Sequence, residues 1–203
     1  MRTPSLRVTL DNISYEIGRV TKLKNALSTV PVDIQYLAAE TILIRLTSAL
    51  EDFISDACYK IASGANYLDG SHPHISIQCR SKAHARYEML NRGRTKPKQW
   101  LKWTRTRYIR DSISNVIESK DNIYIQAGNY GDFIHEVFAV RNFAGHRSAT
   151  SRNEFKAVVS RVYGTPRKMR LGQFLLSPNF LPQSNLERYL STARAMSDDI
   201  CKA

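Results

Sequence analysis

The stretch that decides the fold is VDIQYLAAETILIRLTSALEDFISDACYKIAS, residues 32–63. It follows Pro31, stops before Gly64 and contains no proline or glycine of its own. Its core-facing residues recur every three or four positions, which is the period of one face of an α-helix; they are Leu37, Thr41, Leu46, Leu50, Phe53, Ile54, Ala57 and Ile61. At ~1.5 Å per residue this helix is about 45 Å long. The sequence therefore predicts a helix that serves as the spine of a bundle.

Helical patterns on both sides of this stretch extend the bundle. Apolar residues at helical spacing predict helices over 13–28, 131–144, 152–162 and 185–200. Asp11 or Asn12 is expected to cap the first of these helices, because short polar side chains accept hydrogen bonds from the first free amides. The predicted fold class is all-α, a helical bundle that forms one domain over residues 1–203.

Residues 65–120 do not continue this pattern. Turn residues and a short alternating run predict a loop with a small strand over 65–80. Helical patterns return over 82–91 and 99–119, separated by the turn-like residues 93–97. We interpret residues 65–120 as an insertion that follows the longest helix of the bundle.

The positive charge of the chain is concentrated in this insertion. The whole chain has 30 basic and 18 acidic residues, a net charge of +12. One 31-residue segment carries +10 of that charge, because it holds one acid, Glu88, and eleven basic residues: Arg80, Lys82, Arg86, Arg92, Arg94, Lys96, Lys98, Lys102, Arg105, Arg107 and Arg110. A local excess of this size favours a polyanionic partner, above all a nucleic acid.

Aromatic residues stand among these charges, as in proteins that stack unpaired bases on their side chains. We therefore expect RNA contacts from Lys96, Lys98, Trp100, Lys102, Trp103, Arg105 and Arg107. An alternative stays open. Trp100 and Trp103 are three residues apart and equally fit a buried helix face, in which case the charges around them form a solvated surface.

Several classes of protein are excluded or disfavoured by motifs that the sequence lacks. It has no phosphate-binding glycine loop and no HExxH or GxSxG motif. No run of 18 apolar residues predicts a membrane span, and the first residues do not resemble a secretory signal. Three cysteines without CxxC spacing favour neither a disulfide framework nor a zinc site. We expect a cytoplasmic protein that needs no metal and no cofactor.

One short group remains that carries chemistry, VRNFAGH at residues 140–146. Arg141 and His146 are separated by four residues, and Asn142 directly follows the arginine. In a chain of this composition an arginine and a histidine at this spacing are expected about 0.5 times by chance, and about 0.03 times once the asparagine is required. The group also lies at the end of an apolar helix. An arginine and an asparagine are unusual there, because burying polar side chains without hydrogen-bond partners is unfavourable.

The segment RNFAGH resembles the R-[polar]-x3-H signature of HEPN domains, which are α-helical bundles. The preceding stretch SALEDFISDACYKIA, residues 48–62, resembles the helix before the motif in HEPN toxins of the ribonuclease-like (RiboL-PSP) branch. The resemblance covers residues 30–64 and 125–165 and leaves the insertion out. One departure is Arg147, which stands where glycine is common in the family.

The resemblance implies a metal-independent endoribonuclease that is a toxin or a phage-defence effector. It assigns the catalytic roles to Arg141, Asn142 and His146, and it implies a homodimer with a composite active site and an antitoxin partner. The chemistry agrees, because imidazole transfers protons near neutral pH and guanidinium stabilises phosphate charge. Glu51 and His135 are candidates for side chains that support the site.

Three alternatives remain open. The chain is a catalytically inactive HEPN module that binds RNA or a protein partner, or it is a basic helical DNA-binding protein. The sequence shows no compact helix-turn-helix pattern for the latter. In the third alternative, Arg141 and His146 have no catalytic role and interact with the free carbonyls at the end of a helix.

Overall fold

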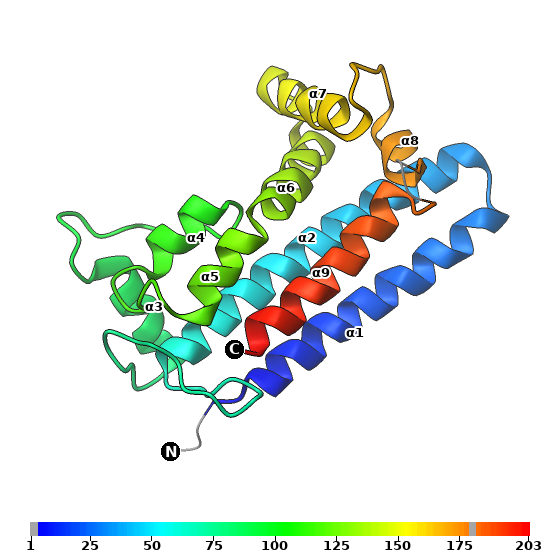
Figure 1. Cartoon of the computed structure of the whole chain (residues 1–203). Helices are drawn as coiled ribbons and strands as arrows, with labels where there is room; N and C mark the ends of the chain where they lie inside the picture. The colour runs from blue at the N-terminus through cyan, green and yellow to red at the C-terminus, as the bar shows by residue number, and fades with distance from the viewer. Residues whose placement is uncertain (1–3, 179–181) are drawn as a thin grey trace.

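The computed structural model describes residues 4–178 and 182–203. Within these residues the regular structure is helical, with two isolated β-bridges, which confirms the all-α prediction. Three long helices lie side by side: α1 (Leu6–Asn25), α2 (Val32–Ala62) and α9 (Asn185–Cys201) (Figure 1). A 3-10 turn, η1 (Ala26–Thr29), and Pro31 reverse the chain between α1 and α2, so these two helices are antiparallel.

The long helix α2 forms as its pattern predicts, but its core face differs near its start. Leu37 is 66% exposed and Thr41 is exposed as well, whereas Ala39, Ile42 and Leu43 are buried. The predicted core positions Leu37 and Thr41 are therefore wrong. Residues 37 and 41 lie on the opposite side of the helix from the buried stripe, and they leave apolar surface in the solvent.

Helix α1 begins earlier than predicted. Ser5 is its N-cap and accepts a hydrogen bond from the backbone N–H of Arg7 at 3.2 Å. Asp11 and Asn12 lie inside the helix on its exposed side, so neither is the cap. The reason is that the apolar period already begins at Leu6 and Leu10, which are both buried against the bundle.

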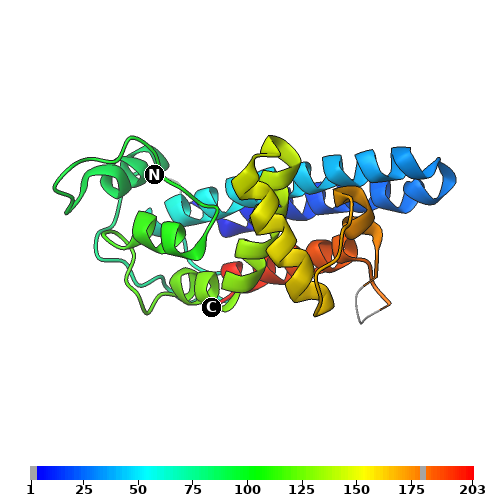
Figure 2. The same cartoon turned by 90° about the horizontal axis from the view of Figure 1, so that it is seen from above.

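The second half of the chain lays shorter helices over this bundle. Helix α6 (Gly131–His146) packs on α2, and α7 (Ala149–Tyr163) packs on α6 and crosses the bundle (Figure 2). Helix α8 (Leu171–Leu176) lies against α2 so closely that a Cβ at Gly172 would stand 2.4 Å from the Cα of Tyr36. The contact therefore requires glycine at position 172.

The insertion gathers at one end of the bundle (Figure 1). It holds α3 (Lys82–Asn91) and α4 (Thr106–Ile113), and it ends just before α5 (Asn122–Asn129). The helix predicted over 82–91 is confirmed. The helix predicted over 99–119 is wrong except for its middle, and the strand predicted over 65–80 is reduced to a single bridge between Ile75 and Ile117.

A buried carboxylate fastens the insertion to the bundle. Asp121 accepts hydrogen bonds from the Tyr67 hydroxyl at 2.5 Å, from the backbone N–H of His74 at 2.7 Å and from that of Ile123 at 3.1 Å. The last of these bonds caps α5.

Among the described residues no helix is both long enough and apolar enough to cross a membrane.

Candidate functional site

The motif predicted from the sequence occupies the last turns of α6. The helix runs without interruption through Gly145 to His146 and ends at Arg147, whose φ of 44° is left-handed. Arg141 and Asn142 are half-buried, while His146 is exposed. In a regular helix Asn142 and His146 share a face, but Arg141 and His146 point about 140° apart. One chain therefore does not direct its arginine and its histidine at the same point.

Two acidic residues of α2 border this end of α6. The pKa of Glu51 is raised by burial and further by Asp52, while the positive charge of Arg141 opposes the rise. Nearer the start of α2, Glu40 forms an ion pair with Arg147 at 3.2 Å. The structure thus brings Glu51 close to Arg141, as proposed from the sequence, and adds Glu40, which the sequence did not indicate. Its spacing of eleven residues before Glu51 places both on one stripe of α2.

This stripe of α2 also carries exposed apolar side chains. Leu37 and Ile44 lie three residues before and four residues after Glu40, so they face the same side of the helix. Leu37 and Ile44 therefore flank Glu40, which pairs with Arg147 at the end of α6. We call Leu37, Glu40, Ile44 and Glu51 the α2 stripe.

His135, the other candidate for a supporting role, is separated from the motif. It is exposed at the first turns of α6 and precedes His146 by eleven residues, which is about 16 Å along the helix axis. The next residue, Glu136, points into the protein and was not singled out in the sequence. It pairs with Arg161 at 3.0 Å and with Arg188, and it accepts a hydrogen bond from Tyr189 at 2.7 Å.

The seven residues expected to bind RNA divide into two groups. Three of them make internal contacts: Lys98 pairs with Asp111, Arg105 pairs with Glu154 at 2.7 Å, and Trp103 is 9% exposed and packs edge-on against Tyr59. The structure does not offer the Trp103 ring to RNA. Four are open to solvent: Lys96, Trp100, Lys102 and Arg107.

The exposed members cluster around one tyrosine of α4. The Lys102 ammonium lies 5.2 Å from the ring centre of Tyr108, and the Arg107 guanidinium lies 4.7 Å from it. Arg107 also donates a hydrogen bond to the Tyr108 hydroxyl at 2.8 Å, which lowers the pKa of that hydroxyl. Trp100 is 58% exposed beside them. This arrangement combines two aromatic rings with two cations at the surface.

In residues 4–178 and 182–203, no three histidine, cysteine, aspartate or glutamate side chains are grouped as metal ligands would be.

Comparison of the chain with protein-family models, with curated proteins and with solved structures gives no match. The candidate site therefore rests on its own residues: a motif at the end of α6, the α2 stripe beside it, and the cationic and aromatic surface of the insertion.

Proposed function

We propose that this chain is a metal-independent endoribonuclease of the HEPN type, with Arg141, Asn142 and His146 as catalytic residues. The observation that carries the proposal is the end of α6, where a solvent-exposed histidine and a half-buried arginine stand five residues apart beside a carboxylate with a raised pKa. The exposed cations of the insertion support an RNA substrate, because they supply contacts to a phosphate backbone.

The proposed reaction is attack by a ribose 2′-hydroxyl on the adjacent phosphorus. A neutral imidazole of His146 accepts the hydroxyl proton as the new oxygen–phosphorus bond forms. Arg141 donates paired hydrogen bonds to the phosphate oxygens, whose negative charge increases in the transition state. An acid protonates the departing 5′-oxygen. The products are a 2′,3′-cyclic phosphate and a 5′-hydroxyl.

Two features favour a homodimer as the active form. One chain supplies one motif histidine, whereas the reaction uses both a base and an acid. Arg141 and His146 of one chain also point in different directions around α6. A two-fold arrangement that covers the apolar part of the α2 stripe gives each phosphate His146 and the partner's His146. Glu51 positions Arg141 in this arrangement.

The nuclease proposal is tested by incubating purified protein with single-stranded RNA in EDTA. We expect the wild type to cleave and both His146→Ala and Arg141→Ala to lose at least 100-fold in rate, because general acid–base catalysis alone contributes about 10²–10⁴-fold. The matched control is His74→Ala, an exposed histidine of the 65–80 segment, which should cleave like wild type. Equal cleavage by all four proteins, or cleavage of an all-2′-deoxy strand, would refute the proposal.

The dimer is tested at the α2 stripe. Leu37→Glu combined with Ile44→Glu should give a monomer in sedimentation experiments and should abolish cleavage although His146 is intact. Leu23→Glu, an exposed leucine on α1, is the control that should stay dimeric and active. A monomeric wild type that cleaves at full rate contradicts the composite site.

The biological role proposed with this activity is that of a toxin or phage-defence effector restrained by an antitoxin. Induced expression should stop growth, and His146→Ala should relieve the arrest. An inactive module that binds RNA or a protein partner is the second candidate. It is favoured by the divergence of Arg141 and His146 within one chain, and it predicts no RNA cleavage under any condition above.

A further inference from the structure

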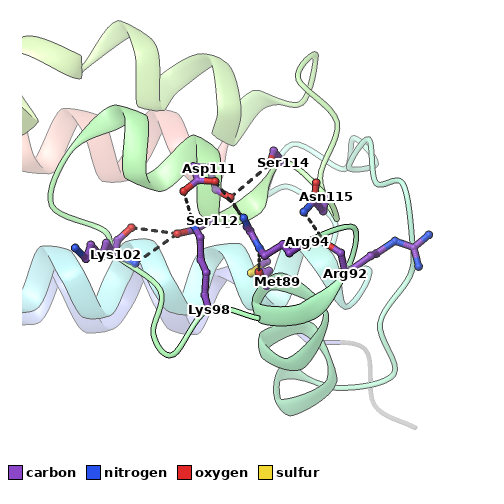
Figure 3. A network of polar contacts seen from close by, with 9 residues as sticks. All are labelled: Met89, Arg92, Arg94, Lys98, Lys102, Asp111, Ser112, Ser114 and Asn115. Atoms are coloured by element: carbon purple, nitrogen blue, oxygen red, sulfur yellow. Dashed lines mark hydrogen bonds and ion pairs between the residues drawn. The ribbon is translucent and has the colours of Figure 1, made fainter. Parts of the chain in front are cut away.

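The exposed surface of the insertion is presented by a loop, residues 92–105, that has no helix of its own yet is fixed along its length. Asn115 donates a hydrogen bond to the carbonyl of Arg92 at 2.6 Å, and the backbone N–H of Lys98 donates to the carbonyl of Leu90 at 2.9 Å. The Ser112 hydroxyl bonds both the N–H and the carbonyl of Lys102 at 3.4 and 3.3 Å (Figure 3).

One carboxylate holds the middle of this loop. Asp111 of α4 pairs with Arg94 at 3.2 Å and with Lys98, and Arg94 also donates to the carbonyl of Met89 at 3.1 Å (Figure 3). Two of the loop's cations are thereby neutralised internally. The Lys102 ammonium is directed away from Asp111, as Figure 3 shows, and is free to meet an external anion.

The loop and α4 enclose a shallow pocket of about 290 Å³, lined by Lys98, Gln99, Trp100, Lys102, Tyr108 and Asp111. Leaving a tryptophan more than half exposed is unfavourable, because burying a large apolar side chain is a main source of stability. The neighbouring buried tryptophan, Trp103, shows that the same loop can cover an indole when it packs on Tyr59. Trp100 is therefore held in the open by a fixed backbone rather than by a lack of structure.

The pocket has the properties of a site for one unpaired nucleotide. An exposed indole offers a flat face on which any base stacks, and stacking of this kind is the main sequence-tolerant interaction of single-stranded nucleic acids. Lys102 and Arg107 lie over the ring of Tyr108, 5.2 and 4.7 Å from its centre, and Tyr108 lines the same pocket as Trp100. Both cations carry the charge that attracts a backbone phosphate. A duplex does not offer a free base face.

We propose that Trp100, Tyr108, Lys102 and Arg107 form a binding site for an unpaired nucleotide of a single-stranded RNA, separate from the motif on α6. The base stacks on Trp100, and the adjoining phosphate contacts Lys102 and Arg107. Arg105, at the end of the same loop, pairs with Glu154 of α7, the helix that follows the motif. The loop is thus joined to the catalytic half of the chain. The inference rests on the proposed RNA substrate but not on its cleavage.

The experiment uses 2′-O-methyl hexanucleotides, which the proposed 2′-hydroxyl mechanism does not cleave. In Trp103→Phe the remaining tryptophan emission comes from Trp100, and it should be quenched by the single strand and not by the same sequence in a duplex. In the wild type, one of the two indole N–H resonances should shift on binding, which repeats the measurement in case Trp103→Phe does not fold.

Variants locate the site. Trp100→Leu should weaken binding about tenfold, the loss expected for one stacked base, while Trp100→Phe retains most of the affinity. Tyr15→Leu, which removes another exposed aromatic ring on α1 with Arg19 over it, is the control and should bind like wild type. Replacing Lys102 and Arg107 together by serine should flatten the logarithmic salt slope by about 1.4 for a single strand.

The outcomes separate this inference from the proposed nuclease. Quenching by a single strand in a protein that cleaves no RNA supports the nucleotide site and removes the nuclease. Cleavage with unchanged affinity in Trp100→Leu supports the nuclease and overturns the nucleotide site. Equal affinity for single strand and duplex, or no response of either indole, also overturns it and leaves the loop as a surface for another class of partner.

Discussion

Among the carboxylates that pair with two cations, one lies inside the bundle and another on the insertion. Glu136 of α6 pairs with Arg161 and Arg188, and its side chain is 9% exposed. Asp111 of α4 pairs with Arg94 and Lys98, and its side chain is 52% exposed. The partners are alike, so the difference between the two networks is how much water reaches the carboxylate.

That difference decides what each network does. Removing a charge from water costs several kcal/mol per ion, and so a buried network must stay complete once it is formed. Glu136 ties α6 to α7 and α9 through Arg161, Arg188 and Tyr189, and thereby fixes the helix that ends in the motif. An exposed pair gains little and breaks easily. Asp111 therefore adds a small restraint, which salt or acid can remove, to a loop whose backbone is also hydrogen-bonded by Asn115 and Ser112.

The largest expected effect follows from removing the buried carboxylate. Glu136→Ala leaves Arg188 and the buried Tyr189 hydroxyl without their shared acceptor, whereas Arg161 is half exposed and can turn to water. We expect a loss of about 2–3 kcal/mol in the free energy of unfolding. Urea denaturation followed by far-UV circular dichroism measures it. Glu136→Gln keeps an acceptor for Tyr189 and should lose less. A loss below 1 kcal/mol for the alanine variant would contradict the distinction drawn between the two networks.

A second prediction concerns Arg147, an exposed residue whose left-handed backbone carries the ion pair with the partly buried Glu40. Left-handed residues other than glycine cost about 1–2 kcal/mol, whereas an ion pair whose arginine is exposed contributes about 1 kcal/mol or less. Arg147→Gly should therefore stabilise the protein by about 0.5 kcal/mol in spite of the lost pair.

The matched variant for this position is Arg147→Ala, which loses the ion pair and keeps the strained backbone. It should be less stable than Arg147→Gly by about 1 kcal/mol, measured by thermal unfolding. If the alanine and glycine variants are equally stable, backbone strain at the end of α6 has no energetic weight.

The parts of the fold that could be predicted from the sequence are those marked by a pattern among residues close together in the chain. The spine α2 and helix α6 were predicted because their apolar residues recur at the helical period over many turns, as with Leu46, Leu50 and Phe53. The helix predicted over 99–119 was wrong. Leu101 and Trp103 turn inward two residues apart, which a helix does not allow, and the helical period starts only with Ile109 and Ile113.

The candidate site likewise combines residues that a local sequence pattern marks with residues that only the fold brings together. Arg141, Asn142 and His146 are contiguous and were found in the sequence, whereas Glu40 lies about a hundred residues from the arginine it pairs with. Nothing local marks that contact. Glu136 did carry a signal, since it lies three residues after Phe133 and four before Val140, on the buried face of a helix of apolar residues. A buried position that is acidic needs partners, and these come from helices that only the fold brings together.

A smaller effect is expected from the exposed network. Asp111→Ala should lower the free energy of unfolding by about 0.5 kcal/mol at low salt, the usual contribution of a surface pair. At 1 M salt the difference from wild type should vanish, because the Debye length falls to about 3 Å. The loss from Glu136→Ala should persist at the same salt concentration. A salt-independent loss at Asp111 would place its network with the buried one.

The smallest effect is the response of the same network to acid. The hydrogen bond from Lys98 and the charge of Arg94 lower the pKa of Asp111 from its ordinary value of 3.8. A lowered pKa means that the ionised carboxylate stabilises the folded loop above the ordinary value, and this contribution is lost as the pH falls through the folded pKa. Between pH 7 and about 4 the loop should therefore be unchanged, and below pH 4 it should loosen.

Quenching of Trp100 emission by acrylamide in the Trp103→Phe protein follows this directly, because Trp100 and Lys98 belong to the same loop. Asp111→Asn should show the loosened value already at pH 7 and no change on acidification. A transition that the asparagine variant retains would have to arise from another carboxylate, and the loop would then not be held by Asp111.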